Sequence, residues 1–164
     1  MENKEIEKLL ELLEKDSTLS DDEMADLLGI TSEKVRALKN KANDEGMLIA
    51  YQAVIDWSKA QDELASALIE VKVTPQKGIG FDKVAHEISK FDEVSAVYLM
   101  SGGYDFAVML ERKSMKEISA FVFEKLATLP SISSTATHFI LRKYKDHKII
   151  LDKEAEDKRV ERPL

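Results

Sequence analysis

The alternating apolar run at residues 93–112, EVSAVYLMSGGYDFAVMLER, constrains the fold of this chain more than any other segment. Both halves have the period-two spacing of β-strands, with apolar residues on both faces, so the run predicts a hairpin within a covered sheet. Val94, Ala96 and Tyr98 are expected to share one face of the first strand. Two adjacent glycines in the turn at 101–105 permit positive φ and leave backbone N–H groups uncovered. The turn either only closes the hairpin or also forms half of a small-molecule pocket.

The segments around this hairpin predict an α+β domain. From residue 64 the pattern is strand, helix, strand, strand, helix, strand, and a capping box from Ser114 to Glu117 begins the second helix. This is the order of a ferredoxin-like βαββαβ sandwich, with two helices on one face of the sheet. The other face still carries apolar residues, so we expect another subunit to cover it.

Periodicity also predicts the limits and faces of these elements. Pro75 is expected to end the first strand, residues 133–144 to form the fourth, and residues 147–151 to add an edge strand. On the fourth strand one face is expected to carry Thr135, Thr137, Phe139 and Leu141. The apolar stripes of the two helices are Phe81, Val84, Ala85, Ile88 and Phe91, and then Met115, Ile118, Phe121, Val122 and Leu126.

Three short amphipathic helices are predicted in the first 46 residues, which gives a three-helix (winged) helix-turn-helix. Apolar spacing places the first helix at 5–15, and a capping box that begins at Ser20 starts the second. Gly29 ends that helix with a left-handed residue, and Thr31 or Ser32 caps the third. The inward side chains are expected to be Met24, Ala25, Leu27 and Leu28 in the second helix and Val35, Leu38 and Ala42 in the third.

The third helix is the element that enters the major groove in a helix-turn-helix. Its first N–H groups and its polar side chains can reach phosphates and base edges of double-stranded DNA. Charge slightly favours the alternative of a solvated helix face, because residues 1–56 hold 7 Lys and Arg against 14 Asp and Glu, which accounts for the whole net charge of −7. The candidate DNA contacts are Ser32, Lys34, Arg36, Lys39, Asn40 and Lys41.

Residues 48–56 contain an apolar run with β-branched and aromatic side chains, and we expect this run to form a strand between two domains. A lone strand leaves an unpaired edge, so pairing with the same strand of a second chain is expected, giving a homodimer with adjacent helical heads. Trp57 is expected to pack against the second domain. The predicted domains are residues 1–60, which include the linker strand, residues 61–151, and a charged tail at 152–164.

The composition excludes several kinds of site. The chain has no cysteine, so disulfides and thiolate metal sites are excluded. His86, His138 and His147 fall on different elements without metal-ligand spacing, and no nucleophile or dinucleotide motif is present, so we expect no metal, cofactor or catalytic residue. The apolar runs are shorter than the ~20 residues of a bilayer span, and the N-terminus lacks an apolar signal core, so a cytoplasmic protein is expected.

Over nearly its whole length the chain resembles the Lrp/AsnC (feast/famine) transcriptional regulators. LSDDEMADLLGITSEKVR and EGMLIAYQAVID resemble their DNA-binding head. VKVTP, FDKVAHEI, VYLMSGGYDFAVML, SMKEISAFV and STATHFILRKYK resemble their effector domain, called RAM. The SGxYD turn together with the STxTHF strand is the specific part of this match. The third helix departs from the family pattern, since Lys39 and Ala42 stand where an aliphatic residue and a leucine are usual.

The resemblance implies homodimers that assemble into octamers or larger, bind operator DNA, and take an amino acid or similar effector where RAM domains of neighbouring dimers meet. Glycine N–H groups can hold a carboxylate, and Asp105 can hold an ammonium group. The alternatives are an Asx-type turn bond for Asp105, ordinary strand roles for the threonines, and a packed sheet histidine at His138. The effector residues carried over by motif are Gly102, Gly103, Tyr104, Asp105, Thr135 and Thr137, with His138 as a further candidate.

The leading hypothesis is a sequence-specific DNA-binding transcriptional regulator that responds to a small effector. The alternative is an oligomeric amino-acid-sensing protein with a degenerate acidic head that does not bind DNA strongly. A third hypothesis is an enzyme on a ferredoxin-like scaffold, for which the sequence supplies little, because a fold alone does not imply chemistry.

Overall fold

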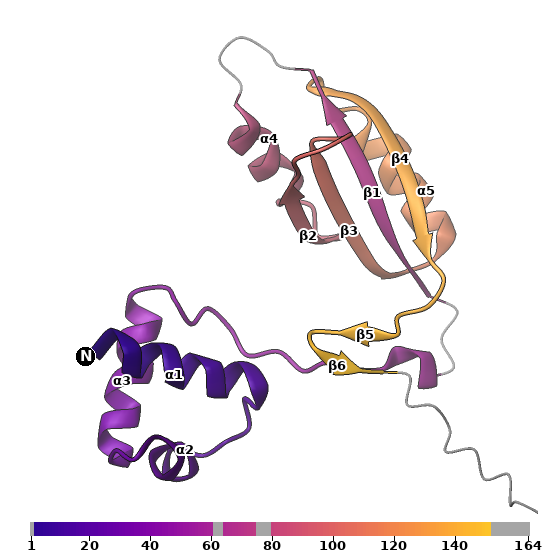
Figure 1. Cartoon of the computed structure of the whole chain (residues 1–164). Coiled ribbons are helices and arrows are strands. Elements are labelled where there is room, and N and C mark those ends of the chain that lie inside the picture. Colours follow the sequence, from indigo (N-terminus) through magenta and orange to yellow (C-terminus); the bar gives the residue numbers. More distant parts are fainter. Residues whose placement is uncertain (1, 61–63, 75–79, 152–164) are drawn as a thin grey trace, which may run out of the picture. The chain divides into compact units, whose positions relative to one another are not determined.

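The computed structural model describes residues 2–60, 64–74 and 80–151 of the chain (Figure 1). The predictions for Pro75 and for the tail at 152–164 lie outside these residues. The helices and strands belong to two compact units, of which the first ends at Ala53 and the second begins at Val54. Each unit has its own apolar core. The division falls earlier in the chain than the expected boundary near residue 60.

The first unit is a bundle of α1 (Glu2–Lys15), α2 (Asp21–Leu28) and α3 (Ser32–Asp44). Each helix turns one apolar stripe inward, as its spacing predicts. Leu27, which was expected inward, is 63% exposed, because the 3.6-residue period turns it away from the buried face of α2. The buried side chains are Ile6, Leu9 and Leu13 from α1, Met24 and Ala25 from α2, and Val35, Leu38 and Ala42 from α3.

Capping residues determine where these helices begin and end. Glu23 N donates to Ser20 Oγ at 3.2 Å, and Ser20 N donates to a Glu23 carboxylate oxygen at 2.8 Å, which completes the predicted capping box. Gly29 ends α2 with a φ of 66°. Thr31 is the N-cap of α3, and its hydroxyl accepts from Lys34 N at 3.3 Å. The predicted helix-turn-helix of α2 and α3 is therefore present.

Residues 48–56 form no strand in this structure, and no strand occurs among the described residues 2–53. Leu48 packs against the core of the three helices, but Ile49 is 88% exposed and Tyr51 is 51% exposed. A strand requires a partner for its backbone groups, and the single chain provides none at this segment. Pairing of 48–56 with a second copy stays a prediction.

The second unit contains a four-stranded antiparallel sheet with the spatial order β2-β3-β1-β4. β1 therefore lies between β3 and β4, inside the sheet, while β2 and β4 form its edges. This order, with two crossover helices, confirms the predicted ferredoxin-like βαββαβ sandwich. The strands are β1 (Ala65–Val73), β2 (Val94–Leu99), β3 (Phe106–Lys113) and β4 (Ile132–Ile140).

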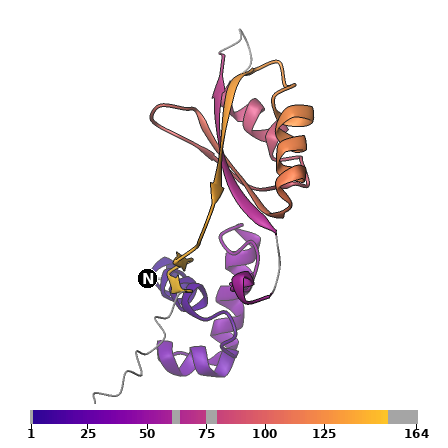
Figure 2. The ribbon, with the colours of Figure 1, turned by 90° about the vertical axis from the view of Figure 1, so that its right-hand side faces the viewer.

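The helices α4 (Phe81–Ile88) and α5 (Met115–Phe121) cover one face of this sheet (Figure 2). α5 continues directly into a π-helix, η2 (Val122–Leu126). Met115, which was expected to face the sheet, is 60% exposed, because it opens α5 before the turn at which Ile118 is buried. The buried core consists of Ala67, Ile69, Val71, Val84, Ile88, Phe106, Val108, Leu110, Ile118, Phe121, Val122 and Leu126.

A β-bulge changes the face of one residue in β2. Val94 pairs with Leu110, while Ala96 pairs with Met109, so the register slips by one residue between them. Directly opposite residues share a face, and Leu110 is buried against the helices. Val94 therefore lies on the helix-covered face, and not with Ala96 and Tyr98 as strict alternation predicted.

The face opposite the helices is partly apolar, as expected. Leu68 of β1 is the partner of Met109 and of His138 on the two sides, and Tyr98 on the same face is 56% exposed. Polar groups interrupt this surface, since His138 Nε2 lies 3.3 Å from a carboxylate oxygen of Glu70. That another subunit covers this face remains a prediction.

Trp57 belongs to the second unit, in the short 3₁₀-helix η1 (Trp57–Lys59). Its ring packs on the guanidinium group of Arg112, at 3.4 Å between the guanidinium carbon and the ring centroid. This is a cation–π contact with β3. The expected packing of Trp57 against the second domain is confirmed.

β4 ends at Ile140, so Leu141, which was expected inside the strand, is 96% exposed. The residues that follow form a separate hairpin of β5 (Lys145–Asp146) and β6 (Ile149–Ile150). Of the predicted edge strand at 147–151, Ile149–Ile150 forms a strand, but it pairs with β5 and not with the four-stranded sheet. The two residues between β5 and β6 have φ of 44° and 68° and turn the chain back on itself.

Lys143 holds the start of this hairpin against the sheet. Its Nζ donates to Glu111 of β3 and, at 3.2 Å, to Asp146 of β5. Burial by itself would lower the pKa of Lys143, but the two carboxylates outweigh it and raise the pKa above its ordinary value. Burial by itself would raise the pKa of Asp146, but its pairing with Lys143 outweighs burial and lowers the pKa below its ordinary value.

Ile69→Ala tests the position of the core. The Ile69 side chain is fully buried in β1, so its truncation is expected to reduce the free energy of unfolding by about 2–5 kcal/mol. Leu141→Ala removes a similar volume from an exposed site and is expected to change it by less than about 0.5 kcal/mol. Urea unfolding measures both, and equal stability of the two variants would contradict this core.

Candidate functional site

The connection between β2 and β3 projects from the sheet on the side away from the helices (Figure 2). Met100 N donates to Asp105 O at 2.8 Å and closes the connection. Neither Gly102 nor Gly103 adopts the positive φ that glycine permits, and a Cβ built at either position meets nothing within 4 Å. Within the described residues nothing requires glycine here. A requirement for glycine would therefore come from outside the chain.

Asp105 anchors this turn to β1. Its N–H donates to Val71 O at 2.9 Å, and its Oδ2 accepts from Val73 N at 2.8 Å. The side chain is half-buried, as is that of the preceding Tyr104. Asp105 therefore has a structural role, with its bond reaching the neighbouring strand rather than its own turn. A carboxylate accepts several hydrogen bonds, so this role does not exclude a ligand contact.

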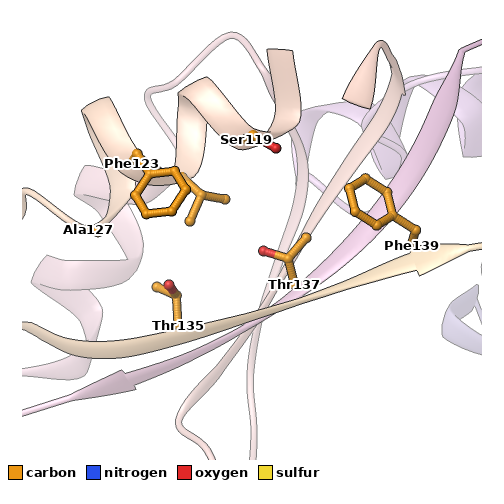
Figure 3. Close-up of a pocket in the computed structure, with 7 residues that line it drawn as sticks. Ser119, Phe123, Ala127, Thr135, Thr137 and Phe139 are labelled. Carbon is orange, nitrogen blue, oxygen red and sulfur yellow. The ribbon is translucent and has the colours of Figure 1, made fainter. Parts of the chain in front are cut away.

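A pocket of about 320 Å³ lies between β4 and the helical segment of α5 and η2. Thr135 and Thr137 rise from β4 toward this segment (Figure 3). Their partners in β1, Val71 and Ile69, are buried under the helices, so both threonines lie on the helix-covered face. The lining residues are Ser119, Val122, Phe123, Ala127, Thr135, Thr137 and Phe139.

Sequence reasoning missed most of the helical wall of this pocket. Ser119, Phe123 and Ala127 are exposed in the single chain and lie off the apolar stripe, so periodicity does not mark them. The one signal available was Phe123, a large aromatic residue outside the stripe, which is 76% exposed. Two of the wall residues belong to η2, and π-helical turns occur frequently at functional sites.

The structure brings together only part of the predicted effector set. Thr135 and Thr137 share the pocket, whereas the turn residues 102–105 are not among those that line it. His138 lies on the other face of β4, beside Glu70, and 56% of its side-chain surface is exposed. In the single chain it is therefore neither in the pocket nor a packed sheet histidine. One chain therefore presents the turn and the pocket as two separate groups.

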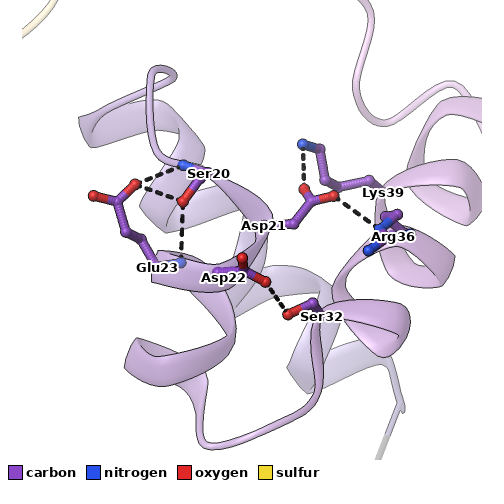
Figure 4. Close-up of polar contacts among 7 residues, drawn as sticks. All are labelled: Ser20, Asp21, Asp22, Glu23, Ser32, Arg36 and Lys39. Atoms are coloured by element: carbon purple, nitrogen blue, oxygen red, sulfur yellow. Dashed lines mark hydrogen bonds and ion pairs between the residues drawn. The ribbon is translucent and has the colours of Figure 1, made fainter.

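Two acids at the start of α2 contact the predicted DNA-binding side chains of α3 (Figure 4). The carboxylate of Asp21 lies 3.2 Å from Arg36 Nε and 3.0 Å from Lys39 Nζ. Asp22 accepts a hydrogen bond from Ser32 Oγ. These candidate residues share one surface of the head, and acids of the same head oppose their charge there.

The remaining candidates on α3 follow the same pattern. Lys34 Nζ lies 2.7 Å from a carboxylate oxygen of Glu5, and Lys41 Nζ lies 4.0 Å from one of Glu45. Asn40 is exposed. Ion pairs in such exposed positions are worth only about 0–1 kcal/mol, so a stronger anionic partner can replace the carboxylates.

The described part of the chain offers no metal centre. Residues 2–60, 64–74 and 80–151 contain no group of three or more His, Cys, Asp or Glu side chains that could hold a metal ion. Over these same residues no helix is both long and apolar enough to cross a bilayer.

Substitution of Asp105 tests its anchoring role. Asp105→Ala is expected to lower the free energy of unfolding by about 1–3 kcal/mol, because Val73 N–H loses its acceptor. Asp105→Asn retains an acceptor oxygen at the same position and is expected to lose less. Urea unfolding measures the difference, and an Asp105→Ala variant as stable as the parent chain would contradict the role.

Comparison with known sequences gives matches to both units. The Lrp/AsnC ligand binding domain matches residues 66–150, which include the whole four-stranded sheet from its second residue. YugG of Bacillus subtilis, named an HTH-type transcriptional regulator, is 43% identical over 154 residues, which cover 93% of each chain. The proline dehydrogenase transcriptional activator of Rhizobium radiobacter is 23% identical over 85% of this chain and 88% of its own.

Solved structures share the fold. AsnC of E. coli superposes with a TM-score of 0.68 at 17% identity, over 91% of this chain and 97% of its own. The regulator NMB0573 of Neisseria meningitidis, solved as a complex with L-Met, gives a TM-score of 0.69 at 19% identity, over 87% of this chain and 90% of its own. These matches agree with the expectation of a regulator rather than an enzyme. With the matched ligand-binding domain and a relative 43% identical over nearly its whole length, this chain belongs to the Lrp/AsnC family of transcriptional regulators.

Proposed function

We propose that this protein is a sequence-specific DNA-binding transcriptional regulator whose binding responds to an amino acid or similar small effector. The observation that carries this proposal is the union in one chain of a helix-turn-helix unit and a ferredoxin-like unit with a small pocket. The names of its relatives as HTH-type regulators support it, and so does the L-Met complex of a regulator with the same fold.

The proposed DNA contacts lie on α3. Arg36 and Lys39 are partly exposed, with 62% and 25% of their side-chain surface accessible, and both are within reach of an incoming phosphate or base edge. Lys34 and Lys41 add charge along the same helix, and Ser32 and Asn40 add hydrogen-bonding groups. Release of Asp21 and Glu5 from these cations would accompany binding.

The proposed effector site combines the turn of one copy with the pocket of another. The exposed N–H groups of Gly102 and Gly103 suit a carboxylate, and the carboxylate of Asp105 suits an ammonium group. Because the turn does not line the pocket that contains Thr135 and Thr137, two copies are needed to place both groups around one ligand. Tyr104, between the glycines and Asp105, completes the proposed set.

The proposed assembly is a homodimer that builds up to an octamer or similar oligomer. Exposed apolar side chains in 48–56, such as Ile49, and the partly apolar open face around Tyr98 provide surfaces for these contacts. Two heads brought together in this way suit a palindromic operator. Binding to chromosomal DNA would place the protein in the cytoplasm.

A second candidate function is an oligomeric amino-acid sensor whose head does not bind DNA strongly. The pairing of Lys34, Arg36, Lys39 and Lys41 with acids of the head favours it, because each pair must be exchanged for a phosphate contact. Avidity of many heads on one DNA molecule opposes it, because linked weak contacts give tight overall binding.

Fluorescence anisotropy with DNA from the protein's own upstream promoter separates the two functions. The parent chain is expected to bind with an affinity that falls as salt rises. Arg36→Ala is expected to weaken binding about fivefold or more, while Lys83→Ala, the same charge change on exposed α4, is expected to leave it unchanged. Absence of salt-sensitive binding by the parent chain would replace the first function with the second.

Asp21→Asn tests whether the acids of the head restrain DNA binding. Asp21 opposes both Arg36 and Lys39, so its neutralisation is expected to tighten DNA binding roughly two- to fivefold. Asp26→Asn makes the same change in net charge at an exposed position of α2 and serves as the control. If Asp21→Asn binds no tighter than Asp26→Asn, Asp21 does not compete with DNA.

A further inference from the structure

On the basis of the proposed function, we infer that the effector of this protein has an uncharged, apolar side chain of the size of leucine, methionine or norleucine. This side chain lies in the pocket between β4 and η2, and the pocket excludes lysine, arginine, aspartate and glutamate. The assignment follows from which chemical groups line the pocket, from where they lie, and from its volume.

No charged side chain is among the described residues that line this pocket. Val122, Phe123, Ala127 and Phe139 are apolar, and the polar groups among the described lining residues are the hydroxyls of Ser119, Thr135 and Thr137. A lysine or glutamate side chain that entered would meet no opposite charge among the lining residues of this chain. In the proposed site the Asp105 carboxylate of the second copy pairs with the ammonium group that every amino acid carries. Transfer of a charge into such surroundings without a counter-ion is strongly unfavourable.

The apolar and hydroxyl groups lie largely on different walls. Thr135 and Thr137 approach from β4, whereas Phe123 and Ala127 approach from the helical side (Figure 3). Val122 belongs to η2 on the same helical side. The exceptions are Ser119 on α5 and Phe139 on β4. Hydroxyls both donate and accept, so the β4 wall suits the ammonium and carboxylate groups common to all amino acids. The helical wall is left for the side chain that distinguishes one amino acid from another.

The volume agrees with a site for one small molecule. The pocket has about 320 Å³, close to the lower end of the range of about 300–1,000 Å³ found for ligand sites. One amino acid with an aliphatic side chain fits within it.

Phe123 gives an independent reason to expect an apolar ligand. It lies in the π-helix η2 and is 76% exposed, so it contributes little to the core of its own chain. Its ring nevertheless borders the pocket (Figure 3). A large aromatic side chain beside a small pocket gains burial when an apolar ligand covers it.

Isothermal titration calorimetry of the full chain with L-norleucine and L-lysine tests the inference. The two ligands have the same aliphatic stem, which ends in a methyl group in one and carries an ammonium group in the other. Norleucine is expected to bind at least about 100-fold more tightly than lysine. Methionine against glutamate is the corresponding test for an acidic side chain, with the same direction expected. Equal or tighter binding of lysine or glutamate overturns the inference.

Two variants connect the selectivity to this pocket. Phe123→Ala is expected to weaken norleucine binding about tenfold or more, and because Phe123 is exposed the variant retains its core. Leu141→Ala, which changes an exposed residue outside the pocket, is the control and is expected to bind as the parent chain does. If Phe123→Ala binds norleucine as tightly as the parent chain does, the effector side chain does not lie in this pocket.

Thr137→Val separates the inference from the proposed function. It keeps the shape of the side chain and removes the hydroxyl, so it is expected to weaken every amino acid that binds, whatever its side chain. If the parent chain binds lysine as tightly as norleucine and Thr137→Val weakens that binding, the effector site is supported and the apolar class of effector is overturned. Failure of all four ligands to bind the parent chain would overturn both the class and the effector response.

Discussion

The hydrogen bonds at the end of β1 are the constraint on which the candidate effector site depends. Val71 O accepts from Asp105 N, and Val73 N donates to the Asp105 carboxylate, so β1 fixes the turn between β2 and β3. On its other side β1 pairs Val71 with Thr135. The turn and the pocket wall are therefore set by one strand, and a slip of one residue in its register would turn Thr135 to the opposite face.

In the helix-turn-helix unit, the acidic residues that stabilise a helix also oppose the positive charge of the surface proposed for DNA. Asp21 begins α2 and belongs to the acidic first turn that favours the helix N-terminus, where negative charge is stabilising. The same carboxylate opposes Arg36 and Lys39 on the surface proposed for DNA. The residues that make α2 a good helix thus reduce the positive potential of α3. In the proposed assembly, several heads acting together would offset this loss of affinity for DNA.

Features set by nearby residues could be predicted from the sequence, and features set by distant pairing could not. The capping box at Ser20 and the left-handed Gly29 act within a few residues, so the sequence shows them directly. The bulge that turns Val94 inward and the bond from Asp105 to Val73 depend on strands distant in sequence. The pocket likewise requires β4 and η2 to lie side by side. The resemblance to family motifs predicted the two threonines of this pocket, but it did not predict the residues of the helical wall.

A structure of the full chain with bound methionine tests the central claim most directly, namely that an apolar amino acid is held between β4 and η2. The claim predicts that the methionine side chain packs against Phe123 and that its polar end lies within hydrogen-bond distance of the hydroxyls of Thr135 and Thr137. Methionine bound on the open face of the sheet, beside His138 and Glu70, with the pocket left empty, would contradict it.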